Sequence, residues 1–262
     1  MTHDTSRSIA LGSLAMALSA SNALGESLKV ETPRGAILDV ILDLPPGNGP
    51  FPAIVLGPGG DYPMVQPALV EPARQLVERG VAVFRFNWAY YTKDPKAGRP
   101  SQDFAFEFED MAAVLNRARN DPRIATDKLF IGGKSLGSLV AWKILQSNKD
   151  LKAAVFLTPI CSSVAPGSTV PTPTGDIRYP GVASELRPLA FILGEQDPLC
   201  AVPLLYRFAA GTGSTSRVAV VAGDHALEMP GLTGSAAAES TLRNTRLAGM
   251  FAADFIAGIA RR

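Results

Sequence analysis

The chain has 262 residues, of which 47% are hydrophobic and 19% are charged, as is ordinary for a globular protein. Its 25 Lys and Arg residues nearly balance its 24 Asp and Glu residues, and the formal net charge is only +1. This balance supplies no overall field to attract nucleic acid or an anionic membrane surface. We therefore expect a small-molecule ligand and no nucleic-acid partner.

The first 23 residues have the order of a secretory signal peptide. Arg7 precedes an apolar run over 9–18, and small residues follow up to Ala23. The run is short and rich in Ala, Ser and Gly, which is typical of a cleaved leader rather than of a membrane span. We expect cleavage after Ala23, a periplasmic or secreted product, and no membrane span in the mature chain. A disordered or helical extension on a cytoplasmic protein is the alternative.

Beyond the leader, short apolar runs alternate with longer amphipathic segments. Apolar strands separated by helices indicate a mostly parallel sheet with helices on both faces. We predict one α/β domain over 24–262 with an antiparallel N-terminal edge. In chain order it comprises a strand pair turning at 33–35, a strand from 51, a helix at about 66–79, a strand at 81–87, a helix at 104–120, a strand at 128–133, a helix at about 136–146, strands at 152–158 and 189–195, a helix near 203–210, a strand at 217–223 and a helix at roughly 236–259.

One long break interrupts this pattern. Residues 160–188 are rich in proline and have no clear period. A loop of this length inside a compact domain is usually functional or mobile, so we expect a long loop here.

The pentapeptide Gly133-Lys134-Ser135-Leu136-Gly137 carries the first chemical signal. A G-x-S-x-G pattern alone is weak evidence, but here it lies where a predicted strand turns into a predicted helix. Glycines suit such a turn because a side chain would collide with the neighbouring backbone. Ligands of open α/β sheets bind at the carboxyl ends of strands. Ser135 is therefore the candidate nucleophile, with a small residue in a glycine-rich loop as the alternative.

A serine hydroxyl needs a base to take its proton, and the usual base is histidine. The sequence has only His3 and His225, and His3 lies in the expected leader. His225 follows the last predicted strand, where the chain order nucleophile, acid, histidine would place it. The alternative is a surface histidine that only solvates its loop.

The imidazole in turn needs a carboxylate that fixes its tautomer. Asp197 follows the penultimate predicted strand and is the candidate, although an Asp-Pro turn alone would also explain its residue type. Glu195 is the rival. Asp224 is less favoured because it is adjacent to His225, and the side chains of consecutive residues point in different directions.

Backbone N–H groups should meet the negative charge that develops on an attacked carbonyl oxygen. The N–H of Leu136 is one candidate, because it lies at the start of a helix whose dipole favours an anion. The second donor should come from the loop at 57–63, and Gly60 or Asp61 is the candidate. The alternative is that these glycines are only turn punctuation.

With these residues identified, the chain resembles the α/β-hydrolase superfamily over nearly all of its mature length. It is similar in particular to the dienelactone-hydrolase-like group that includes the KANL3/Tex30-type hydrolase domains. The resemblance implies a triad of Ser135, Asp197 and His225 and an oxyanion loop near 59–61. We expect no cofactor or metal, because the predicted reaction needs none. Many relatives begin that loop with His-Gly, whereas this chain has Leu56-Gly57-Pro58. The resemblance is carried by the segments GPGGDYP, AVFRFNWAYY followed by GRPSQD, GGKSLGS, GEQDPL and GDHAL, in that order.

The segment after the fourth predicted strand should project over the same sheet edge as Ser135. Trp88, Tyr90 and Tyr91 are candidates to line a substrate pocket, because aromatic groups bury apolar area and keep a polar handle. Packing of the loop onto the domain is the alternative. Arg85 and Lys134 are candidates to bind a substrate carboxylate, with a structural ion pair or a solvated charge as the alternative.

The two cysteines, Cys161 and Cys200, are too few for a disulfide scaffold or a four-cysteine zinc site. Both follow predicted strands at the same sheet edge. An exported protein could join them in a disulfide between the proline-rich segment and the loop of Asp197, and two unpaired thiols are the alternative.

Taken together, the residues predict a serine hydrolase that cleaves esters or related small acyl compounds through an acyl-enzyme. A lactone or peptide-amide hydrolase and an acyltransferase would use the same residues. A non-catalytic binding or scaffold protein on this fold is the alternative from another class.

Overall fold

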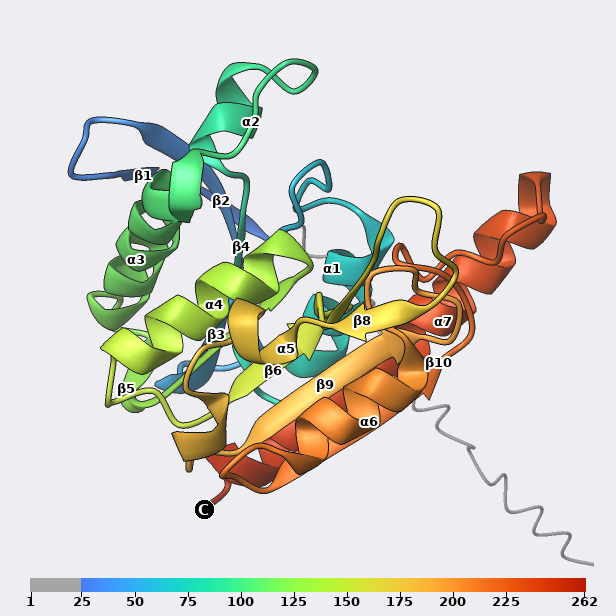
Figure 1. The fold of residues 1–262 in the computed structure, drawn as a ribbon. Helices are drawn as coiled ribbons and strands as arrows, with labels where there is room; N and C mark the ends of the chain where they lie inside the picture. Colours follow the sequence, from blue (N-terminus) through green and yellow to red (C-terminus); the bar gives the residue numbers. More distant parts are fainter. Residues whose placement is uncertain (1–24) are drawn as a thin grey trace, which may run out of the picture.

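The computed structural model describes residues 25–262, so the expected signal peptide at 1–23 lies outside the described residues. Strands and helices alternate along most of this range (Figure 1). The strands are β1 (Glu26–Glu31), β2 (Ile37–Asp43), β3 (Phe51–Gly57), β4 (Ala82–Phe86), β5 (Ile124–Lys134), β6 (Ala154–Leu157), β7 (Ser162–Val164), β8 (Pro171–Pro173), β9 (Leu189–Gly194) and β10 (Ser216–Val221). The helices are α1 (Pro67–Val77), α2 (Ala89–Lys93), α3 (Ala105–Arg119), α4 (Leu136–Ser147), α5 (Gly175–Arg178), α6 (Val202–Ala210) and α7 (Gly234–Ala260), with short 3-10 turns η1 (Gln102–Phe104) and η2 (Val182–Ser184).

The main sheet has the strand order β1-β2-β4-β3-β5-β6-β9-β10. β1 pairs with β2 and β2 pairs with β4 in antiparallel fashion, while every later pair in the sheet is parallel. Both the mostly parallel sheet and its antiparallel N-terminal edge are thus confirmed.

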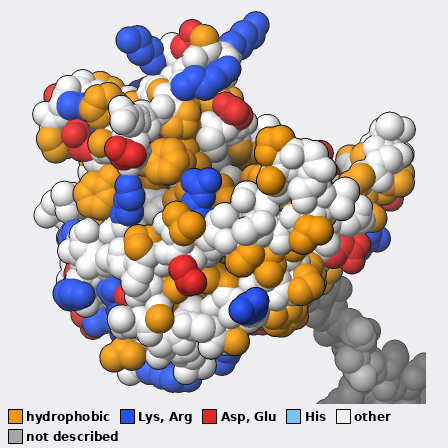
Figure 2. All heavy atoms as spheres, in the orientation of Figure 1, with side chains coloured by type: hydrophobic (Ala, Val, Ile, Leu, Met, Phe, Trp, Pro, Cys, Tyr) orange, Lys and Arg blue, Asp and Glu red, His pale blue; other side chains and the backbone are white. Residues whose placement is uncertain are grey.

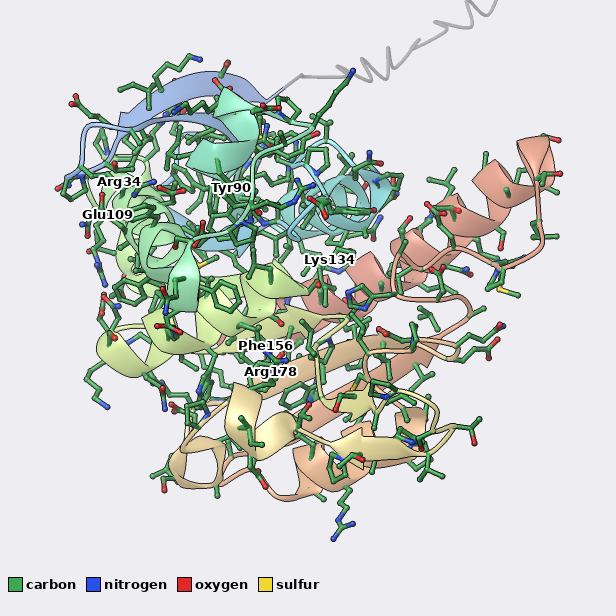
Figure 3. All side chains as sticks on the ribbon, turned by 45° about the horizontal axis from the view of Figure 1, so that its top comes forward. Arg34, Tyr90, Glu109, Lys134, Phe156 and Arg178 are labelled. Carbon is green, nitrogen blue, oxygen red and sulfur yellow. A yellow bond between two sulfur atoms is a disulfide. The ribbon has the colours of Figure 1, made fainter. Side chains whose placement is uncertain are left out.

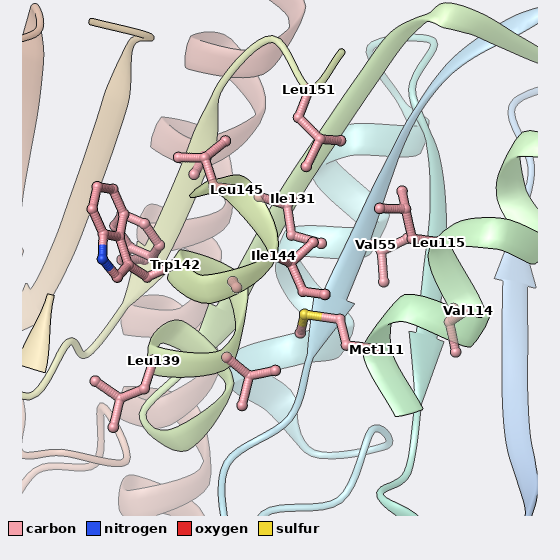
Figure 4. Close-up of a cluster of buried hydrophobic side chains, with 14 of the residues drawn as sticks. Val55, Met111, Val114, Leu115, Ile131, Leu139, Trp142, Ile144, Leu145 and Leu151 are labelled. Atoms are coloured by element: carbon pink, nitrogen blue, oxygen red, sulfur yellow. The ribbon is translucent and has the colours of Figure 1, made fainter. Parts of the chain in front are cut away.

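Two hydrophobic cores lie on the two faces of this sheet. Buried side chains of α3, α4 and α6 cover one face, and those of α1 and α7 cover the other. Figure 4 shows the first core, in which Met111 and Ile144 pack toward Val55 and Ile131 of the central strands. The strands are apolar at nearly every position because both faces are buried. The carboxyl ends of the parallel strands therefore open toward one edge of a rigid platform.

The segment at 160–188 differs from the expected uniform loop. β7 and β8 form a small antiparallel pair within it, and α5 and η2 follow before β9. The buried ring of Tyr179 anchors the segment, because its hydroxyl bonds with the Ser138 hydroxyl at 2.8 Å and accepts from the N–H of Ile160 at 3.1 Å. These elements were not predicted, because elements of three or four residues are too short to show a hydrophobic period.

Lysine and arginine side chains gather at the top of the molecule over α2 and the loop after it, while both signs of charge mix over the rest of this face (Figure 2). Among the helices of residues 25–262, none is both long enough and apolar enough to cross a membrane.

Candidate active site

Ser135 alone makes the turn between β5 and α4. Its φ of 53° and ψ of −116° lie in a region that residues with a side chain rarely adopt. The backbone holds it there, because its N–H donates to the carbonyl of Leu157 on β6 at 3.0 Å and its carbonyl accepts from the N–H of Ser138 at 2.9 Å. The strained turn lifts the hydroxyl above the carboxyl edge of the sheet.

The two glycines that flank the turn are required by packing. A Cβ on Gly133 would lie 2.3 Å from the carbonyl group of Gly137, and a Cβ on Gly137 would lie 2.4 Å from the carbonyl oxygen of Gly57. Strand, helix and the loop after β3 therefore meet at backbone contact distance, which the sequence pattern predicts.

The structure brings Ser135, His225 and Asp197 together from three loops. Nε2 of His225 lies 2.8 Å from Oγ of Ser135, and Nδ1 lies 2.8 Å from Oδ2 of Asp197. The Asp197 side chain is fully buried and the His225 side chain is 22% exposed. Such a line of hydrogen bonds can move a proton from the hydroxyl to the imidazole and stabilise the imidazolium that results.

The loop after β9 fixes the carboxylate of Asp197. Oδ1 accepts the N–H of Leu199 at 2.8 Å, which leaves Oδ2 for the histidine. A disulfide between Cys161 and Cys200 joins this loop to the segment after β6. The N–H of Cys161 also donates to the carbonyl of Leu199 at 3.1 Å. The bridge therefore anchors the loop three residues beyond the acid.

The loop after β10 fixes His225. Asp224 accepts the N–H groups of Ala226 and Glu228, so its carboxylate closes a turn and does not face the imidazole. Leu227 is fully buried at φ 64°, and its carbonyl accepts from Nδ2 of Asn244 on α7 at 3.1 Å. Glu195, the rival acid, is exposed, and its carboxylate accepts from Nε2 of the neighbouring Gln196 at 3.5 Å.

The loop at 57–63, which begins at the last residue of β3, lies beside the serine. A Cβ on Gly59 would come within 3.8 Å of Cβ of Ser135. Trp88 Nε1 donates to the carbonyl of Gly59 at 3.1 Å, and the Tyr90 hydroxyl donates to the carbonyl of Gly60 at 2.6 Å. Because a trans peptide places N–H opposite C=O, these bonds turn the N–H groups of Gly60 and Asp61 away from both rings.

The remaining candidates from the loop after β4 take different places. Trp88 is buried and supports the loop at 57–63 as described above. Tyr91 is half-buried and packs on the core. Arg85 is not brought to the site: its guanidinium bonds to the Asp43 carboxylate at 2.7 Å and to the Met64 carbonyl at 2.7 Å, a structural ion pair.

Lys134 points to the opposite face of the sheet from Ser135's helix, under the loop at 57–63 (Figure 3). Its side chain is buried, and Nζ lies 4.5 Å from the centre of the Tyr62 ring. Burial lowers the pKa of Lys134 to about 8, against the raising effect of Asp197, Asp224 and Glu228. Because three carboxylates already attract this buried ammonium, Lys134 is poorly suited to bind a substrate carboxylate.

A cavity of about 560 Å³ lies between the β1–β2 hairpin, α2 and the start of α3. Tyr90 is part of its wall, together with apolar side chains that include Ile37 and Phe106. Within residues 25–262, no group of three or more His, Cys, Asp and Glu side chains is arranged to hold a metal ion.

Comparisons with known proteins identify the family and the fold. A family model described as an alpha/beta hydrolase domain matches residues 51–253. No protein of curated function matches the sequence.

Solved structures share the fold at low sequence identity. A serine hydrolase without a lid from Xanthomonas campestris is 18% identical, with a TM-score of 0.61 over 89% of this chain and 94% of its own. Est1E from Butyrivibrio proteoclasticus is 14% identical, with a TM-score of 0.65 over 91% and 100%. A dienelactone hydrolase from Anabaena variabilis is 14% identical, with a TM-score of 0.62 over 86% and 94%.

Proposed function

The chain belongs to the alpha/beta hydrolase domain family, and from this premise we propose that it is a serine hydrolase acting on esters or related small acyl compounds. The observation that carries the proposal is the unbroken hydrogen-bonded line from Ser135 through His225 to Asp197. Neighbours described as a serine hydrolase and a dienelactone hydrolase support the chemistry by likeness of fold alone.

In the proposed first half-reaction, His225 Nε2 takes the hydroxyl proton as Ser135 Oγ attacks the carbonyl carbon. The carbonyl oxygen becomes an oxyanion, for which we propose the N–H groups of Leu136 and Gly60 as donors. Leu136 opens α4, so its N–H has no partner within the helix. Gly60 is supported as the second donor because its N–H points away from the Trp88 and Tyr90 rings and its loop lies beside Ser135. Nε2 then gives the proton to the leaving alcohol oxygen, and the acyl group remains on Oγ.

In the second half-reaction, water attacks the acyl carbon while Nε2 takes one of its protons. Collapse of the second oxyanion breaks the bond to Oγ, and Nε2 returns the proton to the serine. The acid product leaves and the starting state is restored. The buried carboxylate of Asp197 keeps the Nδ1 proton in place throughout, so Nε2 is free to act as base and then as acid.

A fluorophosphonate probe tests this proposal, because it labels only activated serines. We expect labelling of the wild type and none of Ser135→Ala. Ser147→Ala, an exposed serine at the far end of α4, is the matched control and should label like the wild type. A folded wild type that resists the probe would instead indicate a non-catalytic binding protein. Aryl esters of increasing acyl length, with a lactone and an anilide, would then rank the substrate classes.

We also propose that the protein is exported to the periplasm or medium. The order of residues in 1–23 and the Cys161–Cys200 disulfide support this, because disulfides persist in oxidising compartments. The intact mass of the unreduced protein tests it. We expect a chain that begins after Ala23 and is lighter than its reduced form by two hydrogen atoms, whereas a cytoplasmic full-length chain would contradict the proposal.

A further inference from the structure

Lys134 is a buried cation that the proposed reaction does not use. It is 2% exposed, and its Nζ makes no hydrogen bond or ion pair with any residue of the described range 25–262. A buried ammonium without a hydrogen-bonding partner costs free energy, so its retention beside the serine calls for a compensating interaction.

The contact that Nζ does make is with the face of the Tyr62 ring, at 4.5 Å from the ring centre. A desolvated ammonium at this distance is attracted by the ring quadrupole. Tyr62 lies near the end of the loop at 57–63, where it forms a β-bridge with Gly59, and its hydroxyl accepts the N–H of Ala68 on α1. The ring is therefore held at its hydroxyl by α1, and the ammonium packs against its face.

Tyr62 connects this contact to the serine. A Cβ on Gly59 would lie 2.9 Å from Cβ of Tyr62 and 3.8 Å from Cβ of Ser135. A shift of the Tyr62 ring would consequently move the backbone that carries the proposed oxyanion donor of Gly60.

The charges around Lys134 come from the loops after β9 and β10. Asp197 acts from the first loop, and Asp224 and Glu228 act from the loop that carries His225. All three carboxylates attract the ammonium. Tyr62 faces it from the loop after β3, and burial raises the pKa of Tyr62 to about 12, so this ring stays neutral at pH 6–9.5.

We propose that Lys134 is a positioning residue that clamps two loops of the active site together. Its ammonium holds the Tyr62 end of the loop at 57–63 against the loop of His225, and so keeps the oxyanion donor beside Ser135. The effect of the clamp on kcat rests on the proposed hydrolase function. The contact between the two loops does not, and tryptophan fluorescence can measure it separately.

Proton loss should open the clamp, because a neutral amine has little attraction for a π face or for carboxylates. The pKa of about 8 places this step in an accessible range. Above it, the turnover number kcat should fall, since the oxyanion donor is displaced. KM should stay within two-fold, because the clamp positions a donor for the oxyanion of the transition state and does not contact the bound substrate.

The test compares Lys134→Met and Lys134→Arg with the wild type in aryl-ester hydrolysis between pH 6 and 9.5. We expect Lys134→Met to lower kcat about ten-fold at pH 7, equivalent to about 1.4 kcal/mol, and to abolish the alkaline fall. The wild type should approach the Lys134→Met value above pH 9. Lys134→Arg should keep most of the wild-type kcat and hold it to pH 9.5, because arginine stays protonated.

A matched control exists in Lys143, whose Nζ lies 5.8 Å from the Phe104 ring centre on the exposed side of α4. Lys143→Met should leave the pH profile unchanged. Tyr62→Leu should reproduce the loss of Lys134→Met, and the double variant should lose no more than either single variant. A wild-type alkaline limb that persists in Lys134→Met, or additive losses in the double variant, would overturn the clamp.

Tryptophan fluorescence separates this failure from failure of the proposed function. Trp88 Nε1 bonds to the Gly59 carbonyl, so release of the loop should change its emission. We expect a transition near pH 8 in the wild type and none in Lys134→Met, whether or not esters are cleaved. If a fluorophosphonate-inert protein shows this transition, the clamp stands without hydrolysis; if the transition is absent from the wild type, the clamp is wrong.

Discussion

Replacing Asp197 by asparagine should disable the base without removing any side chain. Oδ1 accepts the N–H of Leu199 at 2.8 Å, and Oδ2 faces Nδ1 of His225 at 2.8 Å. In Asp197→Asn the backbone N–H of Leu199 can only be met by the amide oxygen. The amide NH₂ group must then face Nδ1, which has to become an acceptor. The imidazole proton moves to Nε2, where it points at Ser135. Nε2 then has no free lone pair and cannot accept the hydroxyl proton.

The size of the loss follows from this change of tautomer. The same exchange in a serine protease triad lowers kcat about 10⁴-fold. Because Asp197 is completely buried and no water can replace the amide, we expect a loss of the same order here. This corresponds to about 5 kcal/mol of transition-state stabilisation. KM should change little, because the carboxylate does not contact substrate.

Steady-state hydrolysis of an aryl ester and the rate of fluorophosphonate labelling would both measure the effect. Glu195→Gln, an exposed acid two residues earlier, is the matched control and should stay within two-fold of the wild type. An Asp197→Asn variant that keeps more than a tenth of wild-type kcat would refute the tautomer argument. If Glu195→Gln lost as much kcat, the assignment of the acid to Asp197 would be wrong.

Three further changes have outcomes fixed by single contacts. Tyr90→Phe removes the 2.6 Å bond to the Gly60 carbonyl, so kcat should fall several-fold at nearly constant KM in the same ester assay, with a loss of about 1 kcal/mol in unfolding free energy. Gly137→Ala forces a Cβ to 2.4 Å from the Gly57 carbonyl oxygen and should lower the free energy of unfolding in urea by about 1–3 kcal/mol. Asp121→Asn should weaken the protein at pH 6 and do so much less at pH 2. The Arg123 guanidinium lowers the pKa of Asp121 from 3.8 to about 2, so its contribution is full above pH 4 and is lost as the pH falls through 2.

Each change has a control. Tyr91→Phe, on the same helix, should leave kcat unchanged. Gly258→Ala on α7 meets nothing within 4 Å and should stabilise the protein by about 0.5–1 kcal/mol, through helix propensity alone. Asp150→Asn breaks a surface pair with Arg119 and should shift stability by less than Asp121→Asn does at pH 6. Equal pH profiles for the wild type and Asp121→Asn would contradict the assignment to Arg123.

Much of the fold could be predicted from the sequence because periodicity and glycines report on it directly. Strands buried on both faces are apolar at nearly every position, and the turn of Ser135 needs glycines at 133 and 137. Because His3 lies in the segment expected to be a leader, His225 was the one remaining candidate base. The short elements β7, β8, α2 and α5 were not predicted, because three to five residues are too few to show a period.

The supporting contacts of the site could not be derived from sequence. Arg85 was a candidate for substrate binding, yet its charge is matched by Asp43, which lies 42 residues earlier and on an antiparallel neighbour strand. Tyr62 was only part of a quoted loop, and Asn244 was one polar residue in a long helix. Their roles depend on which segments pack together across the sheet, and a single sequence contains no signal of that pairing.

The hydrogen bond from Asn244 to the backbone beside His225 has a bearing on biosynthesis. A ribosome delivers the serine first, then the aspartate and the histidine, and only afterwards the helix that aims the imidazole. A partly made chain would thus hold all three reactive groups and still lack the brace that lines them up. The line from Ser135 through His225 to Asp197 would then be braced from α7 only after this last helix has docked.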